Sequence, residues 1–287
     1  MKISMSEEAC RISERKGPFA VLEYQKDSSV NPANADTEYF MAQMGVRKKQ
    51  LMFTLSGNSV TLQAGAMQWS AGDIAMSSGI KGAGGLLKGL ARAAAAKESV
   101  SQPVYSGNGT VVCEPTYKFF LIEDLKNWNG GIVMEDGMFY AHDDRCTSKL
   151  VSRKHFSAMM AGNESLINMS VIGDGYVVME SNVPRGELVC VELEEGDTLR
   201  IDGTFAICWS TGLDFTVERS SASLIGSAVS GEGLVNVYRG TGRVLIAPVT
   251  RSDSYSSATR DMRANVKNPE GTPNFSDIMS GMTSIGK

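Results

Sequence analysis

The chain has 287 residues, 30 of them glycine, and a formal net charge of −4 at neutral pH. This slightly acidic balance excludes a protein that covers nucleic acid with a wholly basic surface. Hydrophobic residues make up 42% of the chain and charged residues 21%, which is ordinary globular composition. No run of 18 apolar residues occurs, so we expect no transmembrane helix.

The cysteine usage and the first residues predict a compartment. The opening stretch MKISMSEEACRISERKG contains no apolar segment, so we expect no secretory signal. The five cysteines are scattered and form no CxxC pair, a pattern typical of buried thiols in a reducing compartment. We therefore expect a cytoplasmic protein, and leave open a peripheral position at a membrane.

The two ends of the chain differ from the middle in composition. Residues 1–50 are predicted to form an extension with one strand, Phe19–Tyr24, followed by the turn-rich stretch 27–34. Residues 251–287 are rich in Ser, Asn, Gly and Pro and poor in apolar residues, so they are predicted to be a loose tail.

The middle of the chain carries an internal repeat. The segment that begins at Gly107, GNGTVVCE, resembles GDGYVVME, which begins at Gly173, 66 residues later. The Asp-Gly pair at Gly137 recurs at Gly203, again 66 residues later. A third copy is marked by glycines on either side of these anchors, Gly65 and Gly240.

These anchors predict one domain, 51–250, made of three related units at about 51–105, 106–171 and 172–250. Each unit has the composition of β-structure, as in the strand, turn and strand expected over 187–201. The Gly-x-Gly pairs interrupt strands, which indicates bulges or a close approach of two backbones.

One segment, 80–97, departs from the β pattern and is predicted to be helical from about Leu86. Its apolar face lies beside several cations, which suits an anionic membrane surface or a protein partner. The alternative is a helix that packs its leucines on the sheet and leaves its cations in solvent. The candidate contact residues are Lys81, Leu86, Leu87, Lys88, Leu90 and Arg92.

Three glutamates, Glu98, Glu164 and Glu232, occupy equivalent places in the three units. Carboxylates that converge on an axis would hold a hard cation, and these are weak metal candidates. The alternative is that each glutamate accepts hydrogen bonds from its own turn or pairs with a neighbouring unit. The stretch His142–Cys146 is predicted to be a solvated polar loop, and we expect no cofactor.

No catalytic residue is predicted, because Gly-x-Ser-x-Gly, P-loop and dinucleotide-binding motifs are all missing from the sequence. We expect a protein that is not an enzyme, although residues brought together in space keep a catalytic site open as an alternative.

Nucleic-acid binding is not expected. The basic cluster 47–49 has the pattern of a solvated run, and Arg239 and Arg243 are a weak indication only.

The repeat motifs resemble a known family, the altered-inheritance-of-mitochondria or mitochondrial-biogenesis family, over about 45–250. The residues that carry the resemblance are QAGAMQ at 63–68, KGAGGLLK at 81–88, DGTF at 202–205, SGEGL at 230–234 and GTGRV at 240–244. The resemblance implies a bacterial protein of unsettled activity. It also implies an all-β, sandwich-like fold of the trp RNA-binding attenuation protein or double-stranded β-helix type, with three units around a pseudo-threefold axis and short helical inserts.

Two functions follow as hypotheses. The first is a non-enzymatic binding or scaffold protein that forms homo-oligomers, since exposed strand edges are commonly covered by self-association. In this version the segment 80–97 contacts an anionic membrane or a protein partner. The alternative is a small-molecule or RNA binder, and its RNA version is a fold-level analogy.

The membrane version predicts co-sedimentation of the purified chain with anionic liposomes. The double variant Lys88→Glu/Arg92→Glu is expected to lose most of this binding, because each cation near such a surface contributes about 1 kcal/mol. Neutral liposomes are the control. A wild-type chain that stays in the supernatant with anionic liposomes would rule this version out.

Overall fold

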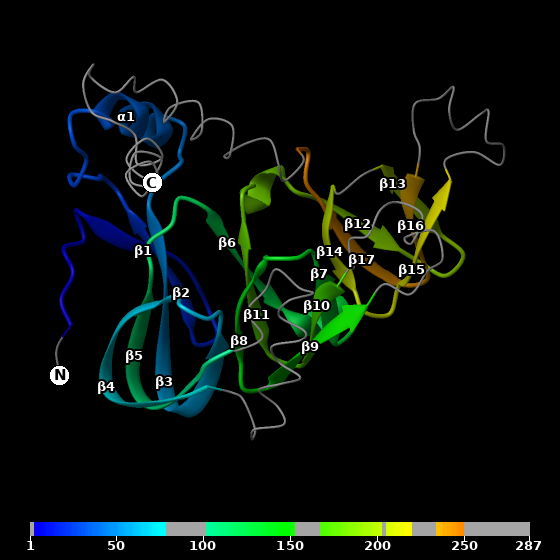
Figure 1. Cartoon of the computed structure of the whole chain (residues 1–287), viewed down its shortest axis with the longest axis horizontal. Helices are drawn as coiled ribbons and strands as arrows, with labels where there is room; N and C mark the ends of the chain where they lie inside the picture. Colours follow the sequence, from blue (N-terminus) through cyan, green and yellow to red (C-terminus); the bar gives the residue numbers. More distant parts are fainter. Residues whose placement is uncertain (1–2, 79–101, 153–166, 203–204, 220–233, 250–287) are drawn as a thin grey trace, which may run out of the picture. The chain divides into compact units, whose positions relative to one another are not determined.

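We analysed a computed structural model of the chain, which describes residues 3–78, 102–152, 167–202, 205–219 and 234–249. Within these ranges the chain is almost entirely β-structure, with seventeen strands, the helix α1 (Ala35–Gln43) and the short 3-10 helices η1 (Leu125–Trp128) and η2 (Arg185–Glu187) (Figure 1). The all-β prediction is confirmed. A compact unit ends at Pro248, and the predicted tail and helical inserts lie outside the described residues.

The first sheet has eight strands in the order β1-β2-β3-β8-β11-β6, with β5 also paired to β3 and β4 paired to β5. Its strands are β1 (Cys10–Lys16), β2 (Phe19–Tyr24), β3 (Lys49–Leu62), β4 (Met67–Ser77), β5 (Val104–Cys113), β6 (Phe119–Asp124), β8 (Phe139–Asp143) and β11 (Tyr176–Ser181). The strand predicted at 19–24 is therefore confirmed, and it joins the N-terminal extension to the repeat region through β3.

The second sheet has six strands in the order β12-β17-β14-β7-β10-β9, and the third has three in the order β13-β16-β15. The second contains β7 (Gly131–Met134), β9 (Cys146–Ser152), β10 (Ile167–Gly173), β12 (Val189–Leu193), β14 (Ala206–Ser210) and β17 (Gly242–Ile246). The third contains β13 (Thr198–Asp202), β15 (Asp214–Arg219) and β16 (Leu234–Arg239).

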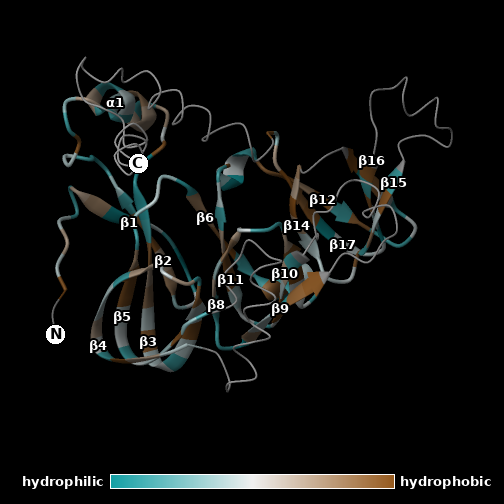
Figure 2. Ribbon diagram, viewed as in Figure 1, coloured by the Kyte–Doolittle hydropathy of each residue, from teal (hydrophilic) through white to brown (hydrophobic). Residues whose placement is uncertain are grey.

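Hydrophobic residues recur along the strands of the sheets (Figure 2), and their side chains pack successive sheets together. One cluster joins the first and second sheets: Leu121 of β6 and Met179 of β11 pack with Ile132 of β7, around the fully buried Trp128. Another joins the second and third sheets through Trp209 and Tyr238, whose rings lie 5.4 Å apart. Burial of these large apolar surfaces is the main stabilising force for the layers.

A bent two-stranded ribbon recurs along the chain. The paired strands β8 and β11 belong to the first sheet, whereas their continuations β9 and β10 pair in the second. In the same way, β14 pairs with β17 in the second sheet, and β15 pairs with β16 in the third. In the first ribbon both strands are continuous, and β4 pairs with β5 along its length.

The predicted close approach of two backbones is confirmed at the Gly-x-Gly pairs that begin at Gly107 and Gly173. A Cβ placed on Gly107 (φ +121°) would lie 2.2 Å from the carbonyl oxygen of Asp73. One placed on Gly173 (φ +144°) would lie 2.2 Å from the carbonyl oxygen of Arg145. Only glycine tolerates both this backbone conformation and this contact.

The strand groups β6–β11 (119–181) and β12–β17 (189–246) have pairing patterns that match strand for strand. The pairs β6–β11, β8–β11, β9–β10 and β7–β10 correspond to β12–β17, β14–β17, β15–β16 and β13–β16. A pseudo-threefold axis and the fold type implied by the family resemblance remain predictions.

Replacing Gly173 by alanine is expected to lower the free energy of unfolding by about 2–4 kcal/mol, because the new Cβ collides with backbone in a left-handed conformation. The matched control is Gly186→Ala in η2, where a Cβ has open space within 4 Å, and its effect should stay within about 0.5 kcal/mol. Urea denaturation measures both, and equal effects would contradict the proposed role of Gly173.

Candidate functional site

The residues predicted from sequence to contact a membrane or partner lie outside the described part of the chain. This applies to the whole cationic segment 80–97 and to the three candidate carboxylates, Glu98, Glu164 and Glu232. The structure therefore neither brings these residues together nor separates them, and both ideas stay predictions.

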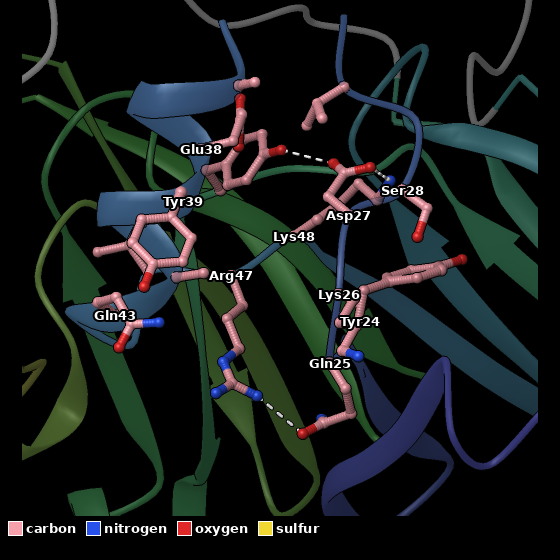
Figure 3. Close-up of a pocket in the computed structure, with 15 residues that line it drawn as sticks. Tyr24, Gln25, Lys26, Asp27, Ser28, Glu38, Tyr39, Gln43, Arg47 and Lys48 are labelled. Atoms are coloured by element: carbon pink, nitrogen blue, oxygen red, sulfur yellow. Dashed lines mark hydrogen bonds and ion pairs between the residues drawn. The ribbon is translucent and has the colours of Figure 1, made fainter.

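A pocket beside α1 is a candidate binding site that the sequence did not predict. We call it the α1 pocket (Figure 3). Its volume is about 450 Å³. It lies among the end of β2, helix α1, the start of β3 and the loop before β6. It is lined by Tyr24, Gln25, Lys26, Asp27, Ser28, Val30, Ala35, Glu38, Tyr39, Ala42, Gln43, Val46, Arg47, Lys48 and Tyr117.

Asp27 is the central acid of the α1 pocket. Its carboxylate accepts a hydrogen bond from the Tyr117 hydroxyl at 2.7 Å and forms an ion pair with Lys48 at 2.9 Å. The Ser29 amide donates to it at 3.1 Å. Burial opposes ionisation, but these three donors together hold the pKa of Asp27 below its ordinary value. Asp27 is thus an ionised structural group at neutral pH.

The basic cluster 47–49 is not the solvated run that the sequence predicts. Arg47 donates to the side-chain oxygen of Gln25 at 2.7 Å, and the Lys48 ammonium lies 4.8 Å from the Tyr24 ring centroid. Lys49 is buried, and its ammonium donates to the Arg47 carbonyl at 3.0 Å. Burial lowers the pKa of Lys49. The prediction was wrong because β3 and its neighbours cover the lysine stem and satisfy its charged end.

Helix α1 presents apolar side chains to solvent. Tyr39 is 61% exposed, Phe40 64% and Met44 83%, and the two rings contact edge to face at 5.5 Å. The sequence contains signals for this helix: Asp36 and Glu38 lie in its first turn, and a glycine closes it at position 45. With the α1 pocket, these side chains form a surface able to take an apolar or aromatic group.

The stretch from His142 to Cys146 is only partly the solvated loop that was expected: Asp144 and Arg145 form an exposed turn, whereas His142, Asp143 and Cys146 are buried. His142 and Asp143 belong to β8 and are 4% and 2% exposed. Asp143 accepts from the Arg145 guanidinium at 2.7 and 3.2 Å, and the Cys146 thiol lies 3.4 Å from it. The loop prediction was wrong for His142 and Asp143, because β3 and β11 pair with β8 on both sides. Within the described ranges, no group of three or more metal-ligating side chains occurs.

All five cysteines lie in the described part as free thiols, and four of them are buried while Cys190 is exposed. Burial raises the pKa of Cys113 and of Cys146 to about 12. These two thiols therefore stay protonated at neutral pH and are weak nucleophiles.

The arginines that gave the weak nucleic-acid indication are engaged in ion pairs: Arg239 with Glu218 at 2.7 Å and Arg243 with Glu192 at 2.8 Å.

From here on we call the strand groups β3–β5, β6–β11 and β12–β17 the three units. Two strand pairings join these units, and the two share one register. In the first joint, β3 pairs with β8. In the second joint, β7 pairs with β14. The paired residues are Val60–Asp143, Thr61–His142 and Leu62–Ala141 in the first, and Ile132–Ser210, Val133–Trp209 and Met134–Cys208 in the second. The second strand of each joint lies one unit further along the chain.

Two strands that correspond to the strands of these joints form no such joint among the described residues. Strand β13 corresponds to β3 and β7, but among the described residues it pairs with β16 alone. Strand β4 corresponds to β8 and β14, but it pairs with β5 alone in the same part of the chain. We call the unpaired sides of β13 and β4 the open edges.

Comparisons with known proteins point in one direction. A family model described as mitochondrial biogenesis AIM24 matches residues 42–249. The chain is 26% identical over 196 residues to an uncharacterized protein of Streptococcus pyogenes serotype M6. This match covers 66% of this chain and 77% of that protein. A crystal structure of a Streptococcus pyogenes protein matches with a TM-score of 0.54 and 22% identity, over 75% of this chain and 94% of the other. That likeness concerns the fold alone.

None of the helices in the described residues is long and apolar enough to cross a membrane.

The burial of His142 predicts a pH-dependent stability. Burial lowers the pKa of His142 in the folded chain, so its contribution is present above the unfolded pKa of about 6.5 and is lost as pH falls toward the folded value. The free energy of unfolding should fall between pH 7.5 and 5.5 by up to about 1.4 kcal/mol per pH unit. Urea titrations at several pH values should show that His142→Asn removes most of this slope. The control His155→Asn should keep it, and an unchanged slope in His142→Asn would refute the assignment.

Proposed function

The chain belongs to the mitochondrial biogenesis AIM24 family, and we propose that it is a non-enzymatic scaffold that assembles with copies of itself. The observation that carries this proposal is the pair of open edges. The chain joins its own units twice by one kind of strand pairing and has one strand of each kind left over. Unpaired edges present rows of backbone donors and acceptors that favour pairing with another chain.

The composition of the open edge β4 supports this proposal. Edge strands that must stay unpaired are commonly protected by Lys, by other charges or by Pro. The outer strand β1 follows that rule, with four charged residues in the sequence CRISERK. Strand β4, with the sequence MQWSAGDIAMS, contains no Lys, Arg or Pro, and Asp73 is its one charge. Met76 on β4 is also 62% exposed. Strand β4 is thus a long edge with a single charged residue.

A second candidate function is a small-molecule binder that uses the α1 pocket. Its volume of about 450 Å³ falls in the range of ligand sites, and tyrosines line it. Three of the five charged residues that line it, Asp27, Arg47 and Lys48, bind one another or their neighbours, so these three offer little to a highly charged ligand. A small molecule retained in native mass spectra of the purified chain would favour this candidate. The RNA version has less support, because Arg239 and Arg243 are engaged by acids.

Light scattering on the eluting chain should give a mass that is a multiple of 30.8 kDa at micromolar concentration. The variant Ser70→Lys places a charge on the exposed face of β4 and is expected to weaken assembly at least about 10-fold, a loss of about 1.4 kcal/mol.

The matched control is Thr147→Lys, an exposed position on the outer strand β9 of the second sheet, which should keep the wild-type mass. A wild-type chain that stays at 30.8 kDa would overturn the scaffold proposal.

A further inference from the structure

We infer that β13 of one copy pairs antiparallel with β4 of a second copy, with Leu199, Arg200 and Ile201 opposite Ala71, Ser70 and Trp69. This inference rests on the proposed self-association and names the surface and the register through which it occurs. It amounts to a third joint of the kind that the chain forms twice within itself.

The β13 side of the register follows from pairings already present. In the first two units, the first strand of each joint also pairs with a strand of its own unit: β3 with β5, and β7 with β10. There Val60 lies opposite Tyr105 and Ile132 lies opposite Val171. The corresponding pair in the last unit is Leu199 with Tyr238. The ribbon partners Tyr105, Val171 and Tyr238 follow one another at spacings of 66 and 67 residues. Leu199 therefore takes the place of Val60 and Ile132.

The β4 side is obtained in the same way. Ala141 lies opposite Val178, and Cys208 lies opposite Leu245, in the two strands that receive a joint. The corresponding pair in the first unit is Trp69 with Val112. Each of these pairs is preceded by a register shift of one residue, in β4 as well as in β8 and β14. This shared bulge marks the same position in all three strands.

The residue types at the open edges suit such a joint. The formed joints bring together apolar side chains that are fully buried, as with Leu62 and Ala141. The corresponding residues at the open edges are Ile201, which is buried, and Trp69, which is half-buried. Pairing would cover Trp69 and give the backbone groups of both edges hydrogen-bond partners.

The middle position would pair Arg200 with Ser70, and both side chains are exposed. A long cation beside a small hydroxyl places no like charge opposite another and leaves the guanidinium in solvent. This explains why a lysine at position 70 is a sharp probe, because it would lie opposite an arginine.

A second copy is the occupant because each chain presents one edge of each kind. Such a contact is heterologous: the two surfaces that meet are different, and every added copy exposes a new edge. Assembly through it gives a closed ring or an open filament, according to the rotation between neighbouring copies.

The experiment is disulfide trapping between two populations of the full chain. One carries Ser70→Cys and the other Arg200→Cys, and both carry Cys190→Ser to remove the exposed native thiol. Directly opposite residues in antiparallel strands have Cα atoms about 4.5–5.5 Å apart, within the range that a disulfide spans. Mild oxidation should give a cross-linked dimer in the mixture and none in either population alone.

The matched control replaces Ser70→Cys by Asp73→Cys, an exposed position three residues along the same strand. Successive side chains of a strand alternate between faces, so position 73 would point to the other face and lie about 10 Å away along the strand. Its mixture with Arg200→Cys should give no dimer. Circular dichroism should show that every variant keeps the wild-type β signal.

The outcomes separate this inference from the scaffold proposal. A ladder of multimers in the double variant Ser70→Cys/Arg200→Cys supports it. Wild-type oligomers without the cross-link in the mixture overturn the pairing but leave the scaffold proposal standing. A disulfide within single chains of the double variant would mean that β13 pairs with β4 of the same chain. That result overturns the inference that a second copy is the partner. A wild-type monomer overturns both.

Discussion

Backbone hydrogen bonds between β3 and β8, and between β7 and β14, join stretches of chain that would otherwise end as separate sheets. Each unit supplies an edge that the next unit covers, so every added unit resolves one unpaired edge and creates another. Unpaired backbone groups are costly when they are shielded from water, so each unpaired strand edge favours pairing with a further strand. The proposed scaffold function extends the same relation beyond one chain.

The glycines allow this relation to be built. A ribbon that leaves one sheet and enters the next must turn, and its two backbones come close together at the turn. Gly107 and Gly173 sit at two of these turns, where a Cβ would meet a carbonyl oxygen at 2.2 Å. At these two positions glycine therefore serves the close packing of strands.

The candidate site shows the limits of local patterns. The α1 pocket is assembled from the end of β2, a nine-residue helix, the start of β3 and Tyr117, which lies far along the chain. Each piece is unremarkable in sequence, and only tertiary contact places Tyr117 against Asp27 at 2.7 Å. The open edges were foreseen only as a class, since strand order cannot be read from composition.

The amino-acid sequence by itself determined the all-β class, the strand at 19–24, the close approach at the Gly-x-Gly pairs and the family. These depend on local alternation, on turn residues and on glycine, whose effects act within a few residues. Tertiary structure alone decided that Lys49, His142 and Asp143 are buried. Their burial came from strands paired across long sequence separations, which supplied both cover and hydrogen-bond partners.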